Sequence, residues 1–107
     1  MSYGLFLSPE AEDDIIALHH YVSERDSVDT ADQLIDELEE QISSLETLSH
    51  RGHRPPELKR LNISNYLEIH YKHWRIIYEI IGNDVYVHAV LDMRRSLQDI
   101  LMERLLR

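Results

Sequence analysis

"WRIIYEIIGNDVYVHAVLDMRRS", Trp74 to Ser96, is the stretch of sequence that decides the fold. Two runs rich in β-branched and aromatic residues flank a connection of hairpin length, Gly82-Asn83-Asp84. Side chains of a strand alternate between its two faces. In the first run this alternation places Trp74, Ile76, Tyr78 and Ile80 on one face, and Arg75, Ile77, Glu79 and Ile81 on the other. Because both faces carry apolar side chains, we expect other elements to cover both.

A third strand and a helix flank this hairpin. "YLEIHY", Tyr66 to Tyr71, precedes it and is separated from it by Lys72-His73, which predicts an antiparallel meander of three strands. On the other side, the Ser96-x-x-Asp99 signature of a helix cap opens a short C-terminal helix.

The N-terminal half predicts one strand and two helices. The apolar run Tyr3 to Leu7 ends at Ser8-Pro9, a helix cap followed by proline at the first helical position. Apolar residues then recur at helical spacing in two segments: Ala11, Ile15, Leu18 and Val22, and after a polar break Ala31, Ile35, Leu38, Ile42, Leu45 and Leu48. We expect an antiparallel helical hairpin whose apolar stripes pack on the sheet.

The segment between hairpin and meander, "SHRGHRPPELKRLNISN" (Ser49 to Asn65), has a glycine, a Pro-Pro pair and no sustained period. It is predicted to be a loop, and its length suggests a function. The predicted fold class is therefore α+β, with an N-terminal strand, a helical hairpin, a three-stranded antiparallel meander and a short C-terminal helix in a single domain over residues 1–107.

The composition narrows the function. Hydrophobic residues make up 43% of the chain and charged residues 29%, as in a folded domain. No apolar segment approaches the ~18 residues of a membrane span, so we expect a cytoplasmic protein without a membrane partner. The net charge of -9 disfavours general nucleic-acid binding. Residues 50–107 nevertheless hold ten basic and seven acidic residues, whereas residues 1–49 hold one basic and 13 acidic residues.

The sequence gives no sign of a cofactor. The absence of cysteine removes thiolate metal ligands. Among the seven histidines, His70, His73 and His88 belong to neighbouring predicted strands, but they lack a close ligand repeat. We therefore expect neither a metal nor a cofactor.

Four stretches, in their order and spacing, resemble the ParE/RelE superfamily of bacterial toxins, and more closely its ParE branch. They are "LSPEAEDDI", "RPPELKRL", "WRIIYEI" and "VLDMRRSLQDILMERLL". The resemblance covers essentially the whole chain. It implies the toxin of a type II toxin-antitoxin system, neutralised by direct binding of a cognate antitoxin, through which DNA would be contacted only indirectly.

The resemblance leaves the target open, because RelE-like relatives cut messenger RNA on the ribosome and ParE-like relatives poison DNA gyrase. Metal-free RNA cleavage needs a base, an acid and donors for the developing charge on phosphate. The resemblance would give Arg75, Arg95 and Lys59 to that chemistry. However, Met93 stands where these nucleases have a further arginine, and Asp99 stands where they have a tyrosine.

The ParE-like signature Leu-His-x-Arg-x-Asp-Leu is similar to "LDMRRSL", residues 91–97, which keeps its arginine as Arg94 and replaces its histidine with Asp92. Losing the histidine removes a possible catalytic group, and the acidic net charge disfavours entry into a phosphate-lined ribosomal site. We predict a gyrase-inhibiting binding protein rather than an enzyme. The alternatives are a RelE-type ribosome-dependent mRNA endoribonuclease and a non-toxic interaction module.

The predicted binding residues are arginines. We expect a compact cationic recess at one end of the sheet, which would bind a carboxylate of the antitoxin or of gyrase, lined by Arg54, Arg75, Arg94 and Arg95. The alternatives are that Arg75 is a structural arginine paired with an acid such as Glu68 or Glu79, and that Arg94 and Arg95 are surface charges.

Overall fold

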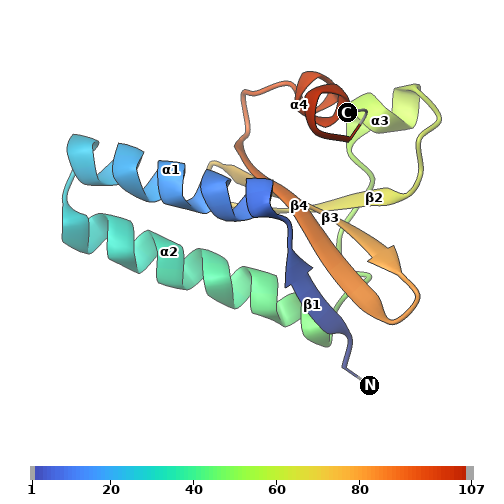
Figure 1. The fold of residues 1–107 in the computed structure, drawn as a ribbon, viewed down its shortest axis with the longest axis horizontal. Coiled ribbons are helices and arrows are strands. Elements are labelled where there is room, and N and C mark those ends of the chain that lie inside the picture. Colours follow the sequence, from blue (N-terminus) through green and yellow to red (C-terminus); the bar gives the residue numbers. More distant parts are fainter. Residues whose placement is uncertain (1, 106–107) are drawn as a thin grey trace.

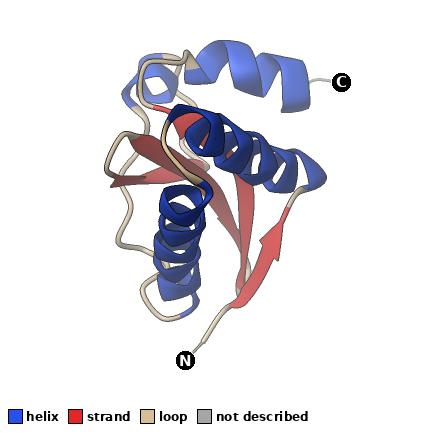
Figure 2. Ribbon diagram, turned by 90° about the vertical axis from the view of Figure 1, so that its left-hand side faces the viewer, coloured by secondary structure: helices blue, strands red, loops and turns tan. Residues whose placement is uncertain are grey.

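The computed structural model describes residues 2–105 and shows a four-stranded sheet with a helical hairpin on one face and two short helices on the other (Figures 1 and 2). The elements in chain order are β1 (Gly4–Leu7), α1 (Pro9–Arg25), α2 (Val28–Ser43), the 3₁₀ turn η1 (Ser44–Glu46), α3 (Pro56–Arg60), β2 (Tyr66–Tyr71), β3 (Trp74–Ile81), β4 (Asp84–Asp92) and α4 (Leu97–Leu105). The predicted α+β fold is confirmed.

The strands lie in the order β1-β4-β3-β2. β2, β3 and β4 form the predicted antiparallel meander, and β1 pairs in parallel with β4. β1 has only four residues, and its pairing ends at Leu7 opposite Val87. The C-terminal half of β4, from His88 to Asp92, therefore has no strand on that side, and α1 runs beside it instead. This uncovered half of β4 forms one wall of the groove described below.

The two faces of β3 pack as their alternation predicts. Ile76 and Tyr78 belong to the larger core, under α1 and α2, whereas Ile77 belongs to a smaller core under α3 and α4. The pairing of β3 with β4 shifts by one residue between Ile77 and Tyr78, so His88 is the extra residue of a β-bulge on β4. Each face of the sheet thus has its own apolar cluster.

Three helices begin with a serine whose side chain caps the first turn. The Oγ of Ser8 accepts the Ala11 N–H at 3.1 Å. The Oγ of Ser27 accepts the Thr30 N–H at 3.0 Å, and that of Ser96 accepts the Asp99 N–H at 3.4 Å. Each bond satisfies a donor of the first turn that would otherwise have no partner.

Two predictions about residues 44–65 are wrong. The second helix does not continue to Leu48, because the chain tightens into η1 after Ser43, and Leu48 is 58% exposed. The predicted loop contains α3, with Pro56 at a position that suits proline in a first helical turn. A helix of five residues is too short to show a hydrophobic period, so its signals are the proline at its start, Glu57 in its first turn and the basic residues Lys59 and Arg60 in its last turn.

A buried tyrosine fixes the start of this segment. The side chain of Tyr78 is fully buried, its hydroxyl donates to the Ser49 carbonyl at 2.7 Å, and it accepts the Gly52 N–H at 3.0 Å. Burial raises the pKa of Tyr78, so the hydroxyl stays protonated and can donate. A Cβ at Gly52 would lie 2.5 Å from that hydroxyl oxygen, which explains the glycine.

Candidate functional site

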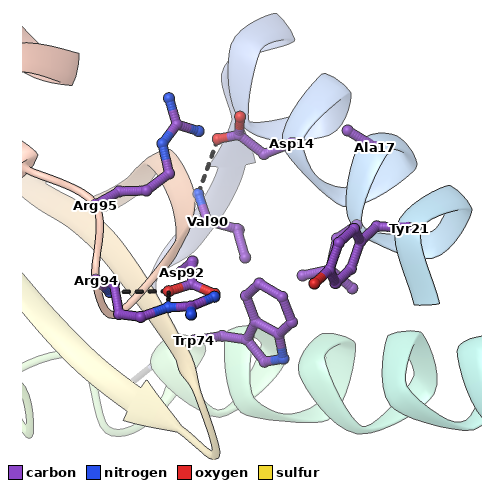
Figure 3. A pocket seen from close by; sticks show the side chains of 9 residues that line it. Asp14, Ala17, Tyr21, Trp74, Val90, Asp92, Arg94 and Arg95 are labelled. Carbon is purple, nitrogen blue, oxygen red and sulfur yellow. Dashed lines mark hydrogen bonds and ion pairs between the residues drawn. The ribbon is translucent and has the colours of Figure 1, made fainter. Parts of the chain in front are cut away.

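The candidate binding site is a groove of about 450 Å³ between α1 and the C-terminal half of β4 (Figure 3). We call it the α1–β4 groove. It is lined by Asp14, Ala17, Leu18 and Tyr21 of α1, by Trp74, Val90 and Asp92 of the sheet, and by Arg94 and Arg95. Its walls combine two aromatic rings with two guanidinium groups, a combination that is common at protein interfaces.

One end of the groove is closed by ion pairs and hydrogen bonds. The Asp14 carboxylate accepts the Val90 N–H at 2.9 Å and two hydrogen bonds from Arg104, at 2.6 and 2.7 Å. Arg104 also donates to the His88 carbonyl at 3.2 Å. These contacts satisfy the uncovered edge of β4 and tie α4 to α1. Nearby carboxylates, above all that of Asp14, raise the pKa of Arg104.

The segment that follows β4 contributes two arginines to the groove, Arg94 beside Trp74 and Arg95 on the side of Asp14 (Figure 3). Arg94 pairs with Asp92 through its Nε at 3.0 Å and its backbone N–H at 2.8 Å, and these hydrogen bonds lower the pKa of Asp92. The Arg94 side chain is nevertheless 86% exposed. Arg95 is also exposed, and its guanidinium makes no hydrogen bond or ion pair with any residue in the described range 2–105. Arg95 is therefore available to bind a carboxylate of a partner.

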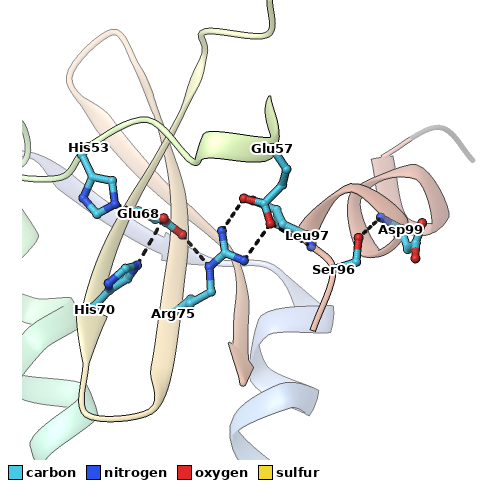
Figure 4. A network of polar contacts seen from close by, with 8 residues as sticks. All are labelled: His53, Glu57, Glu68, His70, Arg75, Ser96, Leu97 and Asp99. Carbon is cyan, nitrogen blue, oxygen red and sulfur yellow. Dashed lines mark hydrogen bonds and ion pairs between the residues drawn. The ribbon is translucent and has the colours of Figure 1, made fainter. Parts of the chain in front are cut away.

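Arg75 lies on the opposite face of the sheet, in a network of buried charges (Figure 4). Its Nε donates to Glu68 Oε2 at 2.6 Å, and its two terminal nitrogens donate to the Glu57 carboxylate at 2.9 and 2.8 Å. Only 7% of the Arg75 side chain and 1% of the Glu68 side chain are exposed. Glu57 also accepts the Leu97 N–H at 3.4 Å, so the network joins α3, β2, β3 and the start of α4.

Stability at acid pH is expected to depend on Glu57. Hydrogen bonds from Arg75 lower the pKa of Glu57 from 4.5 to about 2. A carboxyl whose pKa is lower in the folded than in the unfolded chain contributes stability above the unfolded value and loses it as pH falls through the folded value. The free energy of unfolding, measured with a chemical denaturant, should therefore be about 2–3 kcal/mol larger at pH 6 than at pH 2.5 because of this group. Glu57→Gln should lose most of that difference, and a difference unchanged in this variant would contradict the assignment.

The structure places the predicted site residues in separate locations. Arg94 and Arg95 line the groove together, but Arg75 is buried behind the sheet, and Arg54 and Lys59 are exposed beside and on α3. The predicted grouping of Arg75 with Arg94 and Arg95 in one recess is therefore wrong. The open alternative, that Arg75 is structural and pairs with Glu68, describes its contacts correctly. The part that each arginine plays in binding stays a prediction.

Sequence reasoning missed several residues of the site. Trp74 was assigned only to a strand face and Tyr21 was not singled out, although an exposed aromatic residue near cations is a signal for an interface. Asp14 and Arg104 are 90 residues apart, and their pairing had no local signal.

One cluster has the residue types of a metal site. The ring nitrogens Nε2 of His53 and His70 lie 3.0 and 3.2 Å from Glu68 Oε1. The histidines considered from the sequence are not brought together, because His88 contacts Glu79 and His73 lies in the β2–β3 turn.

No described helix has both the length and the apolar character needed to cross a membrane.

No curated protein sequence matches the chain significantly. A solved structure described as "Chromosomal ParDE TA system from P. aeruginosa" has the same fold, with a TM-score of 0.72 at 12% identity, covering 87% of this chain and 98% of that chain. A family model described as "ParE toxin of type II toxin-antitoxin system, parDE" matches residues 5–97. This match covers most of the chain and extends from β1 through the groove arginines to the first residue of α4, so the protein belongs to the ParE toxin family of type II toxin-antitoxin systems.

Proposed function

We propose that this ParE-type toxin inhibits DNA gyrase in the cytoplasm and is neutralised by a cognate antitoxin that binds it directly. The observation that carries the proposal is the α1–β4 groove, in which exposed Arg94 and Arg95 line the same hollow as Trp74 and Tyr21, with Arg94 beside Trp74 (Figure 3). Aromatic residues supply contact area and arginines supply paired donors for carboxylates, so the groove suits a peptide or loop with an acidic and an apolar residue.

The mode of antitoxin binding follows from the same surface. An extended or helical antitoxin segment would lay its apolar side chains over Trp74 and Tyr21 and direct a carboxylate to Arg95, folding as it binds. Gyrase inhibition and antitoxin binding would exclude each other if both partners use the groove. The antitoxin would then act by occupying the surface that gyrase needs.

The contacts of Arg75 disfavour the alternative of RNA cleavage. Three of its five N–H groups already donate to Glu57 and Glu68, and only 7% of its side chain is exposed, so two carboxylates balance its charge and little of it is open to a phosphate. The shallow hollow beside it, about 300 Å³, contains these two acids and Arg60, so its two carboxylates balance its two arginines. Metal-free phosphoryl chemistry needs an excess of positive charge at that place.

The proposal predicts a specific result in two parallel assays. The purified protein should inhibit supercoiling by DNA gyrase and increase gyrase-dependent DNA cleavage, and it should leave messenger RNA intact in a translation reaction. Expression without antitoxin should stop growth. Cut message with unaffected gyrase would replace the proposal by the RelE-type activity. No effect in either assay, together with normal growth, would favour the alternative of a non-toxic interaction module.

A further inference from the structure

The cluster around Glu68 has a geometry that none of the proposed activities uses. We propose that His53, Glu68 and His70 bind a divalent transition-metal ion such as Zn²⁺ (Figure 4). The three ligand atoms lie within 4.8 Å of one another, and they come from the segment before α3 and from β2. This site differs from the α1–β4 groove and lies on the other face of the sheet.

The backbone holds these residues in place without a metal. The N–H of His53 donates to the Glu68 carbonyl at 3.0 Å, and the N–H of Glu68 donates to the His53 carbonyl at 2.8 Å. His70 follows Glu68 by two residues on the same strand, so both side chains point to the same face. All three residues are therefore fixed relative to one another by strand geometry.

The distances agree with coordination by zinc. Zinc binds histidine nitrogen and carboxylate oxygen at about 2.0–2.2 Å in a tetrahedral arrangement, which separates neighbouring ligand atoms by about 3.4 Å. The observed separations from Glu68 Oε1 to the two Nε2 atoms are 3.0 and 3.2 Å. All three ligand atoms lie within 4.8 Å of one another, so rotation of the two partly exposed rings can bring them to a common ion. Two histidines and one carboxylate leave a fourth position for water.

Arg75 is not a metal ligand, but it orients the ligand Glu68. It holds Glu68 through Oε2, which fixes the carboxylate and leaves Oε1 toward the histidines. Ligating carboxylates are usually oriented by such a hydrogen bond. The His53 and His70 side chains are 57% and 38% exposed, so an ion can reach them from solvent. Imidazole and carboxylate without thiolate favour zinc, nickel or copper over magnesium or calcium.

Titration of the full-length chain, without an affinity tag, with ZnCl₂ tests this site. Isothermal titration calorimetry at pH 7.5 should show one zinc ion bound per chain. His53→Ala and His70→Ala should each weaken this binding at least about tenfold. His20→Ala is the matched control, because His20 is an exposed histidine of α1 that lies outside the cluster and pairs with Glu24, and the binding curve of this variant should not change. At pH 5.5 the wild-type affinity should fall, since histidine must be deprotonated to bind the metal.

A second measurement separates the cluster from chance binding to surface histidines. Zinc in hundredfold excess over its dissociation constant should raise the Tm of the wild type by about 10 °C or more, and that of His53→Ala by much less. No saturable binding, or binding that survives both cluster substitutions, would overturn the proposal. Both His variants remove partly exposed side chains, so a Tm in EDTA close to that of the wild type would show that each still folds.

Discussion

Replacing Arg75 with methionine is expected to lower the free energy of unfolding by about 3–5 kcal/mol, because two carboxylates lose their common partner inside the protein. Glu68 is almost fully buried and Glu57 mostly so, at 1% and 18% side-chain exposure. Their charges cannot be hydrated where they lie, and methionine fills the volume without supplying a donor. Urea unfolding at pH 7, followed by circular dichroism, measures the loss.

The loss of unfolding free energy in Arg75→Met should become smaller as the pH falls. In the variant the buried carboxyls are expected to have raised pKa values, so they take up protons in the folded state as pH falls, whereas the wild type loses the contribution of Glu57. The difference between the two proteins should therefore narrow from pH 7 toward pH 3. An equal difference at both pH values would show that the substitution acts through packing and not through charge.

Two control variants identify the cause. Arg94→Met removes an exposed arginine that pairs with one acid, and it should leave the unfolding curve unchanged. The triple substitution Glu57→Met, Glu68→Leu and Arg75→Met replaces the whole network with apolar side chains. It should recover most of the stability, since a buried ion-pair network often contributes no more than good apolar packing. A triple variant as unstable as Arg75→Met alone would contradict this account.

The sequence was sufficient for the elements that depend on local pattern. Alternation in β3 predicted two covered faces, and Ser8, Pro9 and Ser96 predicted helix starts, because each signal lies within a few residues of the structure it causes. The end of α2 and the presence of α3 were not predictable in the same way. The 3₁₀ turn after α2 continues the spacing of apolar residues almost unchanged, and α3, with five residues, is too short to show such a spacing.

The candidate site was predicted less well, since it depends on contacts across the chain. Alternation alone already places Trp74 and Arg75 on opposite faces of β3. What the sequence does not contain is the pairing of Trp74 with Asp92, which brings Arg94 and Arg95 to the face of the tryptophan. Glu57, the main partner of Arg75, belongs to the helix that the sequence did not reveal. The sequence could identify the arginines as candidate binding residues, but it could not predict which of them lie together in the fold.

The largest functional effect is expected from reversing the charge of the groove. Arg94→Glu combined with Arg95→Glu places four negative charges, with Asp14 and Asp92, around the aromatic side chains of the groove. A partner carboxylate would then meet repulsion in place of paired donors. We expect the concentration that halves gyrase supercoiling to rise at least about a hundredfold, equivalent to about 3 kcal/mol. Both arginines are exposed and make few internal contacts, so the Tm should stay close to that of the wild type.

The matched control is Arg51→Glu combined with Arg60→Glu, which changes the net charge equally and lies outside the groove. It should keep inhibiting gyrase, because a general change of the electrostatic field is screened over about 8–10 Å at physiological salt. Equal loss in both double variants would assign the effect to net charge. A groove variant that still inhibits gyrase but no longer binds its antitoxin would restrict the groove to the antitoxin, and the two partners would then use different surfaces of the toxin.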